Sequence, residues 1–178
     1  MATSHAQTLL MERLRTVVPE VLEEMAALSV PASPGPWDDE LDWFVWEHAG
    51  LACVILRHRF GTLNAYVVVP KEHSAYDLDV DQFSDIDVHG GVTYAGHLHS
   101  LDWWIGFDAM HMWDLIPAMH RPTEDSPFSE VDLAGPERDF VYRDFDYVMS
   151  ECNKLADVIA SRTKWGYYDP DPTDRIRS

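Results

Sequence analysis

Two short segments constrain the fold more than any other part of the chain. LACVILRHR (51–59) and LNAYVVVP (63–70) are rich in β-branched residues and are separated by a glycine-containing turn, a pattern typical of paired strands. Successive residues of a strand point to opposite faces of a sheet. Because CVIL and YVVV are apolar at every position, both faces of these strands are apolar. We therefore expect central strands that are covered on both sides.

A third strand precedes these two. WFVWEH (43–48) is separated from the next strand only by Ala49-Gly50, so the three segments predict an antiparallel meander. Pro70 ends the last of them, because proline cannot donate a hydrogen bond to a strand ladder.

Helical periodicity marks both ends of the chain. The N-terminal segment, 1–29, repeats apolar residues at three- and four-residue steps and predicts a helix that is kinked or divided at Pro19. A second, long helix is predicted from 137 to 162. Its apolar positions step strictly by three and four, which favours packing on a sheet over a coiled coil. These positions are Val141, Phe145, Val148, Cys152, Leu155 and Ile159.

The remaining segments read as connections. The stretch 31–40 is rich in proline, and 119–136 contains three prolines and a glycine. Because these residues interrupt helices and strands, both stretches predict loops. The polar stretch 71–87 predicts a long connection with one helical turn near 80–83. The tail, 163–178, predicts a loop whose aromatic residues Trp165, Tyr167 and Tyr168 could dock onto the body.

The stretch DVHGGVTYAGHLHSLDWWIGFDAMHMWD (87–114) predicts a hairpin closed around 99–102. Pairing Leu98 with Trp103 places Tyr94 opposite Phe107 and gathers the apolar residues on one face. A register shifted by one residue would mix the faces and is disfavoured. The predicted polar face brings His89, Thr93, Asp108 and His111 together, with Trp104 on the same side.

Glycines interrupt this hairpin at positions 90, 91, 96 and 106. Glycine inside a strand marks a bulge or a close approach by backbone or ligand. The approaching group could be a ligand, a tryptophan or the C-terminal helix.

Together these elements predict one α+β domain over 1–178. The domain is a five-stranded, mainly antiparallel sheet over 41–118, with an N-terminal helix and a long C-terminal helix packed on it.

Charge and composition limit the partners. Thirteen basic against 31 acidic residues give a net charge of −18, which disfavours a nucleic-acid partner. No apolar run has the length of a membrane span and no leader segment is recognisable, so we expect a cytoplasmic protein with no membrane partner. The two cysteines, Cys53 and Cys152, are expected to be buried free thiols.

The candidate catalytic residues are Asp108, His111 and His89, because a carboxylate beside an imidazole fixes its tautomer and prepares a general base. The candidate ligand-binding residues are Gly90, Gly91, Thr93 and Trp104. An aromatic platform for a planar ring could be Trp103, Trp104, Trp113 or Tyr94. A structural Asp–His hydrogen bond and tryptophans that only fill the core remain the alternatives.

A divalent metal is a further candidate cofactor. Its ligands would be His89, Asp108, His111 and Asp114, although their spacing matches no zinc motif. His97-x-His99 adds two imidazoles near the hairpin tip. Serine hydrolysis is disfavoured because the chain has no G-x-S-x-G, and nucleotide folds with a Walker or G-x-G-x-x-G loop are excluded.

The pieces HGG-x-T (89–93) and WWIGFD-x-x-H (103–111) occur here with a strand ending YVVVP (66–70) and a helix carrying V-x-x-EC-x-x-LA (148–156). In this combination the chain resembles a family of small uncharacterised proteins from bacteriophage and bacterial genomes. The resemblance covers roughly 60–160. It implies a common site around these pieces and an accessory protein in the bacterial or host cytoplasm, without implying a reaction.

Three functions follow as hypotheses. The first is a site for a small polar metabolite, nucleotide-like ones included, on the 88–111 hairpin of a binder or hydrolase. The second is an acidic protein that binds or inhibits a protein partner without catalysis. The third is a metal-dependent hydrolase.

Overall fold

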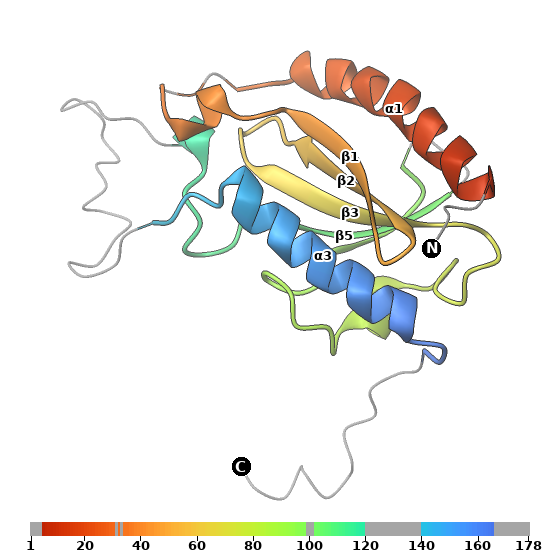
Figure 1. The fold of residues 1–178 in the computed structure, drawn as a ribbon. Helices are drawn as coiled ribbons and strands as arrows, with labels where there is room; N and C mark the ends of the chain where they lie inside the picture. Colours follow the sequence, from red (N-terminus) through yellow and green to blue (C-terminus); the bar gives the residue numbers. More distant parts are fainter. Residues whose placement is uncertain (1–4, 31, 33, 99–101, 120–139, 166–178) are drawn as a thin grey trace, which may run out of the picture.

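The fold is a five-stranded antiparallel sheet between two helices (Figure 1). The computed structural model describes residues 5–30, 32, 34–98, 102–119 and 140–165. Helix α1 (His5–Ala26) covers one face of the sheet and helix α3 (Phe145–Ser161) covers the other. The predicted α+β class, with an N-terminal and a C-terminal helix on one sheet, is confirmed.

The strands are β1 (Trp43–His48), β2 (Leu51–Arg57), β3 (Leu63–Val69), β4 (Tyr94–Gly96) and β5 (Trp103–Asp108). Their order in the sheet is β1-β2-β3-β5-β4, and each neighbouring pair is antiparallel. The predicted meander is therefore β1-β2-β3. In the described connections, three short 3₁₀ turns lie at Pro36–Asp39, Val80–Phe83 and Pro117–Met119, and the second matches the turn expected near 80–83.

The two central strands are buried on both faces, as their sequence predicts. Toward α1, Val54 and Val68 join a core that includes Leu14 and Val18 of the helix. Toward α3, alternate strand residues join a second core. That core includes Cys53, Ile55, Val67, Ile105, Val148, Cys152, Leu155 and Ile159. The cysteines are buried and free, as expected.

Both helices differ from their predicted bounds. Helix α1 runs through Pro19 as one element, so the division into two short helices is wrong. Helix α3 has 17 residues and is shorter than predicted. It starts after Asp144, whose Oδ1 accepts a hydrogen bond from the backbone N–H of Tyr147 at 2.8 Å and so caps the first turn. The prediction placed the start of this helix at 137, eight residues earlier. Of those eight residues, 137–139 lie outside the described part of the chain.

The segment 140–144 is not helical because it is held by the loop that follows β5. The backbone N–H of Val141 donates to the carbonyl of Trp113 at 3.0 Å, and the N–H of Leu115 donates to the carbonyl of Val141 at 3.0 Å. These bonds form a β-bridge between Asp114 and Val141. The bridge brings the start of α3 beside the end of the β5 loop.

The predicted hairpin register is wrong by one residue. Tyr94 lies opposite Gly106 and Gly96 opposite Trp104, rather than Phe107 and Ile105. The prediction assumed a sheet with one apolar face, whereas α1 and α3 cover both. Tyr94 therefore packs with the α1-side core, while Trp103 packs with the α3-side core.

The last described residues dock onto the body of the domain. Trp165 docks as expected, with its ring 5.0 Å from that of Phe83 and its Nε1–H donating to Ser74 Oγ at 3.1 Å. Tyr167 and Tyr168 lie outside the described residues. Within the described ranges, no helix combines the length and the apolar character that a membrane span requires.

Candidate functional site

A tight turn presents the first histidine of the site. Residues 88–91 form it, with the N–H of Gly91 donating to the carbonyl of Val88 at 2.8 Å. Gly90 has φ +65°, in the left-handed region that favours glycine. The segment 88–93 is therefore a turn and an approach to the sheet, and only 94–96 pairs as β4. His89 projects from the turn rather than from a strand face.

Asp114 is the centre of the site. Its side chain is 1% exposed, and the β-bridge to Val141 fixes its backbone. Its Oδ2 accepts hydrogen bonds from His89 Nε2 at 2.7 Å and from the backbone N–H of His111 at 2.8 Å. Its Oδ1 accepts from Arg143 Nε at 2.8 Å. One buried carboxylate thus gathers three segments that are far apart in the sequence.

The tautomer of His89 follows from its partners. A carboxylate can only accept, so Nε2 carries the proton that bonds to Asp114. The other ring nitrogen, Nδ1, then accepts from the hydroxyl of Tyr147 on α3 at 3.0 Å. The backbone N–H of His89 donates to Glu151 Oε2 at 3.0 Å, one turn further along the helix. Helix α3 therefore holds both the ring and the backbone of this residue.

His111 is the accessible imidazole of the site. Its ring packs over Gly90, where an added Cβ would lie 2.0 Å from Cε1 and Nε2. Its centroid is 5.0 Å from that of His89. Its side chain is 32% exposed, yet its Nδ1 is buried and has no hydrogen-bond partner within the described part of the chain. The distance from this nitrogen to Asp114 Oδ2, 3.6 Å, is too long for a hydrogen bond.

Arg143 completes the group, which we call the His–Asp cluster: His89, His111, Asp114, Arg143 and Tyr147. The guanidinium carbon lies 4.8 Å from the centre of the Tyr147 ring, and Nε is used by Asp114. In the described ranges the terminal nitrogens of Arg143 make no further hydrogen bond, and the side chain is half-buried.

The pKa of Asp114 reflects these contacts. Burial alone would raise it, but the hydrogen bonds from His89, from Arg143 and from the backbone of His111 lower it to about 2. The carboxylate is therefore ionised at every pH above that range. Such a group can fix an imidazole for acid–base work, or it can serve as a metal ligand.

The structure brings some of the predicted site residues together and separates others. His89, His111 and Asp114 offer ligand atoms that lie within 4.8 Å of one another. Asp108 is not part of this group. Its carboxylate accepts from Thr93 Oγ1 at 2.8 Å and from the backbone N–H of Met110 at 3.1 Å. The predicted Thr93–Asp108 contact is present, but as a separate exposed pair.

The remaining predicted residues serve the scaffold. Trp104 is fully buried under α1, so its expected place on an open ligand face is wrong, because both sheet faces are covered. Gly91 shapes the turn with φ +80°. At the hairpin tip, His97 Nδ1 bonds to the carbonyl of Asp102 at 2.9 Å, while His99 lies outside the described residues. The protein itself makes the close approaches at two of these glycines: the His111 ring lies over Gly90, and the carbonyl of Ala65 and the ring of Tyr66 lie against Gly106.

Sequence reasoning missed Arg143, Tyr147 and Glu151. Tyr147 and Glu151 lie four residues apart, so a polar edge beside the apolar seam of α3 was a readable signal for these two, whereas Arg143 precedes the helix. What it could not show is which loop this edge faces.

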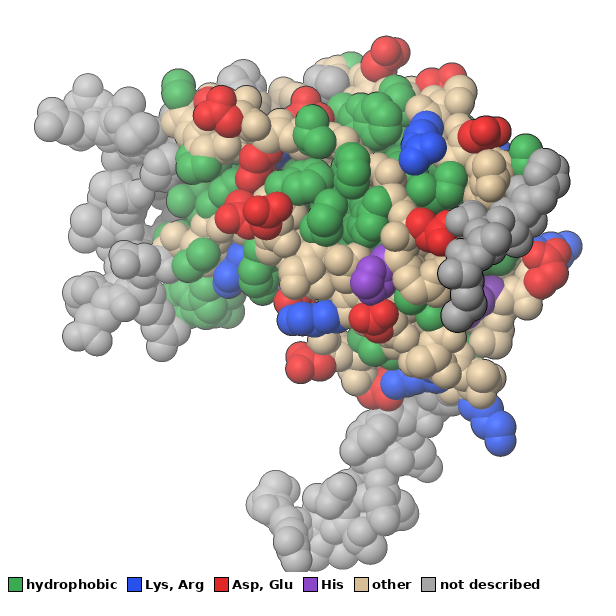
Figure 2. Space-filling model, in the orientation of Figure 1, with side chains coloured by type: hydrophobic (Ala, Val, Ile, Leu, Met, Phe, Trp, Pro, Cys, Tyr) green, Lys and Arg blue, Asp and Glu red, His purple; other side chains and the backbone are tan. Residues whose placement is uncertain are grey.

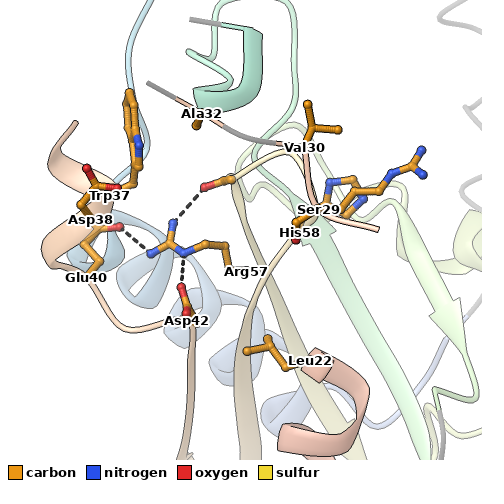
Figure 3. Close-up of a pocket in the computed structure, with 12 residues that line it drawn as sticks. Leu22, Ser29, Val30, Ala32, Trp37, Asp38, Glu40, Asp42, Arg57 and His58 are labelled. Atoms are coloured by element: carbon orange, nitrogen blue, oxygen red, sulfur yellow. Dashed lines mark hydrogen bonds and ion pairs between the residues drawn. The ribbon is translucent and has the colours of Figure 1, made fainter. Parts of the chain in front are cut away.

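A cavity of about 370 Å³ lies elsewhere, beside Arg57 between the 29–42 segment and the β2–β3 turn (Figure 3). Arg57 donates to Asp42, Glu40, Tyr142 and the carbonyls of Leu41 and Gly61, so all five of its N–H groups are used. Arg57 is therefore neutralised, although His58 and Arg59 also line this cavity. We place the chemistry at the His–Asp cluster, because its two histidines and its carboxylate lie close enough to act together.

A search of known proteins finds no family model, no curated protein and no solved structure that matches this chain.

Proposed function

We propose that this protein binds a small anionic metabolite at the His–Asp cluster, of a nucleotide-like kind that carries a planar ring beside its anionic group. The observation that carries the proposal is Arg143. Its guanidinium is oriented by Asp114 and Tyr147, and its two terminal nitrogens keep their donors available in the described part of the chain.

An arginine fixed in this way is suited to a phosphate or carboxylate. Two parallel N–H donors match the two oxygens of such a group, and a pre-oriented fork loses little freedom on binding. His111, half-exposed in the same cluster, adds a second donor. The net charge of −18 makes a local group of cationic donors unusual in this chain, and a local pocket of donors can override the average field.

Two exposed apolar side chains, Met112 and Trp113, follow His111 directly in the sequence. Trp113 is 37% exposed, and its ring centroid lies 6.3 Å from that of Phe140. Trp113 therefore replaces the buried Trp104 as the candidate platform for a planar ring. The combination of an anion fork with an exposed indole is what favours a nucleotide-like ligand over a simple acid.

The same residues support catalysis as well as binding. Asp114 holds His89 in one tautomer, and His111 has a ring edge accessible to a ligand, so a proton could be moved at His111. The chain would then be a hydrolase rather than a binder. The resemblance to phage and bacterial proteins makes an accessory role in the bacterial cytoplasm part of this proposal.

The test uses chelator-treated protein and three probes: adenosine monophosphate, inorganic phosphate and adenosine. Isothermal titration should show binding of the nucleotide, weaker binding of phosphate and weaker binding of the nucleoside. Arg143→Lys keeps the positive charge beside Asp114 but lacks the two parallel donors of the guanidinium. It should weaken nucleotide binding by about tenfold, which corresponds to the loss of roughly one charge-assisted hydrogen bond.

Arg162→Lys is the matched control. Arg162 also pairs with a carboxylate, Asp85, and its guanidinium carbon lies 4.9 Å from the centre of an aromatic ring, that of Trp165. Equal weakening by both variants, or no binding of any probe by the wild type, would refute the anion site.

A second candidate is a protein-interaction role. Figure 2 shows hydrophobic side chains gathered over the β1 edge of the sheet, beneath α1, where Leu41 and Phe44 are exposed. A cavity of about 530 Å³ between α1 and β1 adjoins them. Phe44→Ser should abolish capture of a partner from bacterial lysate if this surface is used, whereas Met112→Ser should not.

A further inference from the structure

We infer that His89, His111 and Asp114 bind one divalent transition-metal ion, with Zn²⁺ the expected occupant. Two imidazoles and a carboxylate are a donor set that zinc and its first-row neighbours accept. The three ligand atoms come from the 88–91 turn and the loop after β5, both of which are fixed by backbone hydrogen bonds.

The distances are close to those between ligands of one ion. His89 Nε2 and Asp114 Oδ2 are 2.7 Å apart, and His111 Nδ1 and Asp114 Oδ2 are 3.6 Å apart. Atoms that share an ion at bond lengths of about 2.1 Å are separated by about 3.0–3.5 Å. Small movements of two side chains would therefore bring all three onto one ion.

The unpartnered nitrogen of His111 is the observation that favours an ion over a closed hydrogen-bond network. Nδ1 is buried and has no partner in the described ranges, and burying such an atom without a partner is unfavourable. Gly90 leaves room for the Cε1 and Nε2 atoms of the His111 ring, which would lie 2.0 Å from an added Cβ. Coordination to an ion would satisfy the buried Nδ1.

Two of the three ligands also have an outer partner. Tyr147 bonds to His89 Nδ1, and Arg143 bonds to the second oxygen of Asp114. A tyrosine hydroxyl can donate or accept, so Tyr147 can accept from Nδ1–H once Nε2 gives its lone pair to the ion. Outer partners of this kind fix the tautomer and the ring orientation of metal-bound histidine.

Arg143 does not exclude the ion. It lies on Oδ1, whereas the proposed ligand atom is Oδ2. With three protein ligands, zinc keeps a position for water or substrate, as in catalytic zinc sites. Use of that position in hydrolysis rests on the proposed anion site, whereas ion binding itself does not.

The test is a titration of chelator-stripped, full-length protein, made without a histidine tag, with Co²⁺ followed by absorption and with Zn²⁺ followed by calorimetry. The wild type should bind one ion per chain. His111→Ala should weaken binding by at least the 10–100-fold that loss of an outer partner costs, and Tyr147→Phe by about that amount.

His48→Ala is the matched control. His48 also bonds to an aspartate, Asp157, at 2.9 Å, and its side chain is 34% exposed, close to the value for His111. The variant His48→Ala should bind the ion with the same affinity as the wild type. No ion in the wild type, equal loss in His48→Ala, or unchanged binding in His111→Ala would overturn the metal site.

The two proposals fail separately. The ion titration contains no metabolite, and the metabolite titration uses stripped protein. If the wild type binds no metal but still binds the nucleotide, only the metal proposal fails. Arg143→Lys keeps a cation beside Asp114 Oδ1, so its affinity for Co²⁺ should be within about tenfold of that of the wild type.

Discussion

Two polar clusters join the loops of this protein to the start of α3, and they differ in how completely their donors are used. In the first, Arg57 directs all five N–H groups to partners, and Glu40 also accepts from Tyr142 at 2.5 Å and from the first backbone N–H of α3 at 3.0 Å. In the second, the His–Asp cluster, one buried ring nitrogen and the ends of one guanidinium lack partners in the described chain.

The difference separates a structural role from a functional one. A saturated network fixes the chain and has nothing left to offer a ligand, whereas an incomplete one retains groups that a ligand can satisfy. A polar cavity lies beside the saturated cluster, so a hollow alone does not identify a site in this fold.

The largest expected effect is at Arg57. Arg57→Met keeps most of the side-chain volume but leaves Glu40 and Tyr142 without their cation, and removing one member of a buried ion pair costs about 3–5 kcal/mol. Burial and the Glu40 hydrogen bond already raise the pKa of Tyr142, so it would remain neutral. Urea unfolding should show this loss in the free energy of unfolding.

The comparison for this variant is Arg162→Met. Its pair with Asp85 is exposed, and pairs of that kind contribute about 0–1 kcal/mol. A similar loss in both variants would mean that the Arg57 cluster is no more structural than a surface pair.

The second effect is a pH dependence centred on Asp114. Its folded pKa of about 2 lies below the ordinary value of 3.8, so its ionised form stabilises the fold. This contribution, about 2 kcal/mol, is fully present above the unfolded pKa and is lost as the pH falls from about 4 through 2. In metal-free protein, the difference in unfolding free energy between wild type and Asp114→Asn should shrink over that window and stay constant at about pH 5 and above. A constant difference down to pH 2 would contradict it.

How much of this the sequence could predict depends on whether a feature is local. The strands β1 to β3 and the covered faces of β2 and β3 follow from runs of apolar residues. The proximity of His89 and His111 was also predicted, although through a hairpin register that proved wrong, because the turn at Gly90 and not a strand pair brings them together.

The rest depends on packing between distant segments. Asp114 meets Arg143 only because Val141 bridges to the β5 loop, and Tyr147 meets His89 only because α3 crosses the sheet at this place. A local pattern can show that positions 147 and 151 share one edge of a helix. It cannot show which loop that edge faces. The sequence therefore favours Asp108, which is near in the predicted hairpin, as the carboxylate partner of the histidines.

The smallest expected change in stability is at His111, and it sharpens the comparison most. His111→Ala removes a half-exposed ring whose buried nitrogen has no partner in the described chain, so the free energy of unfolding of the metal-free protein should change by no more than about 0.5 kcal/mol. The same variant should lose Co²⁺ binding. Arg57→Met should do the reverse, keeping Co²⁺ affinity under conditions in which it is folded. A loss of about 2 kcal/mol or more in His111→Ala would make its ring part of the scaffold, and both clusters would then be structural. The Arg57 cluster serves stability and the His–Asp cluster serves binding only if the buried nitrogen of His111 serves a ligand rather than the fold.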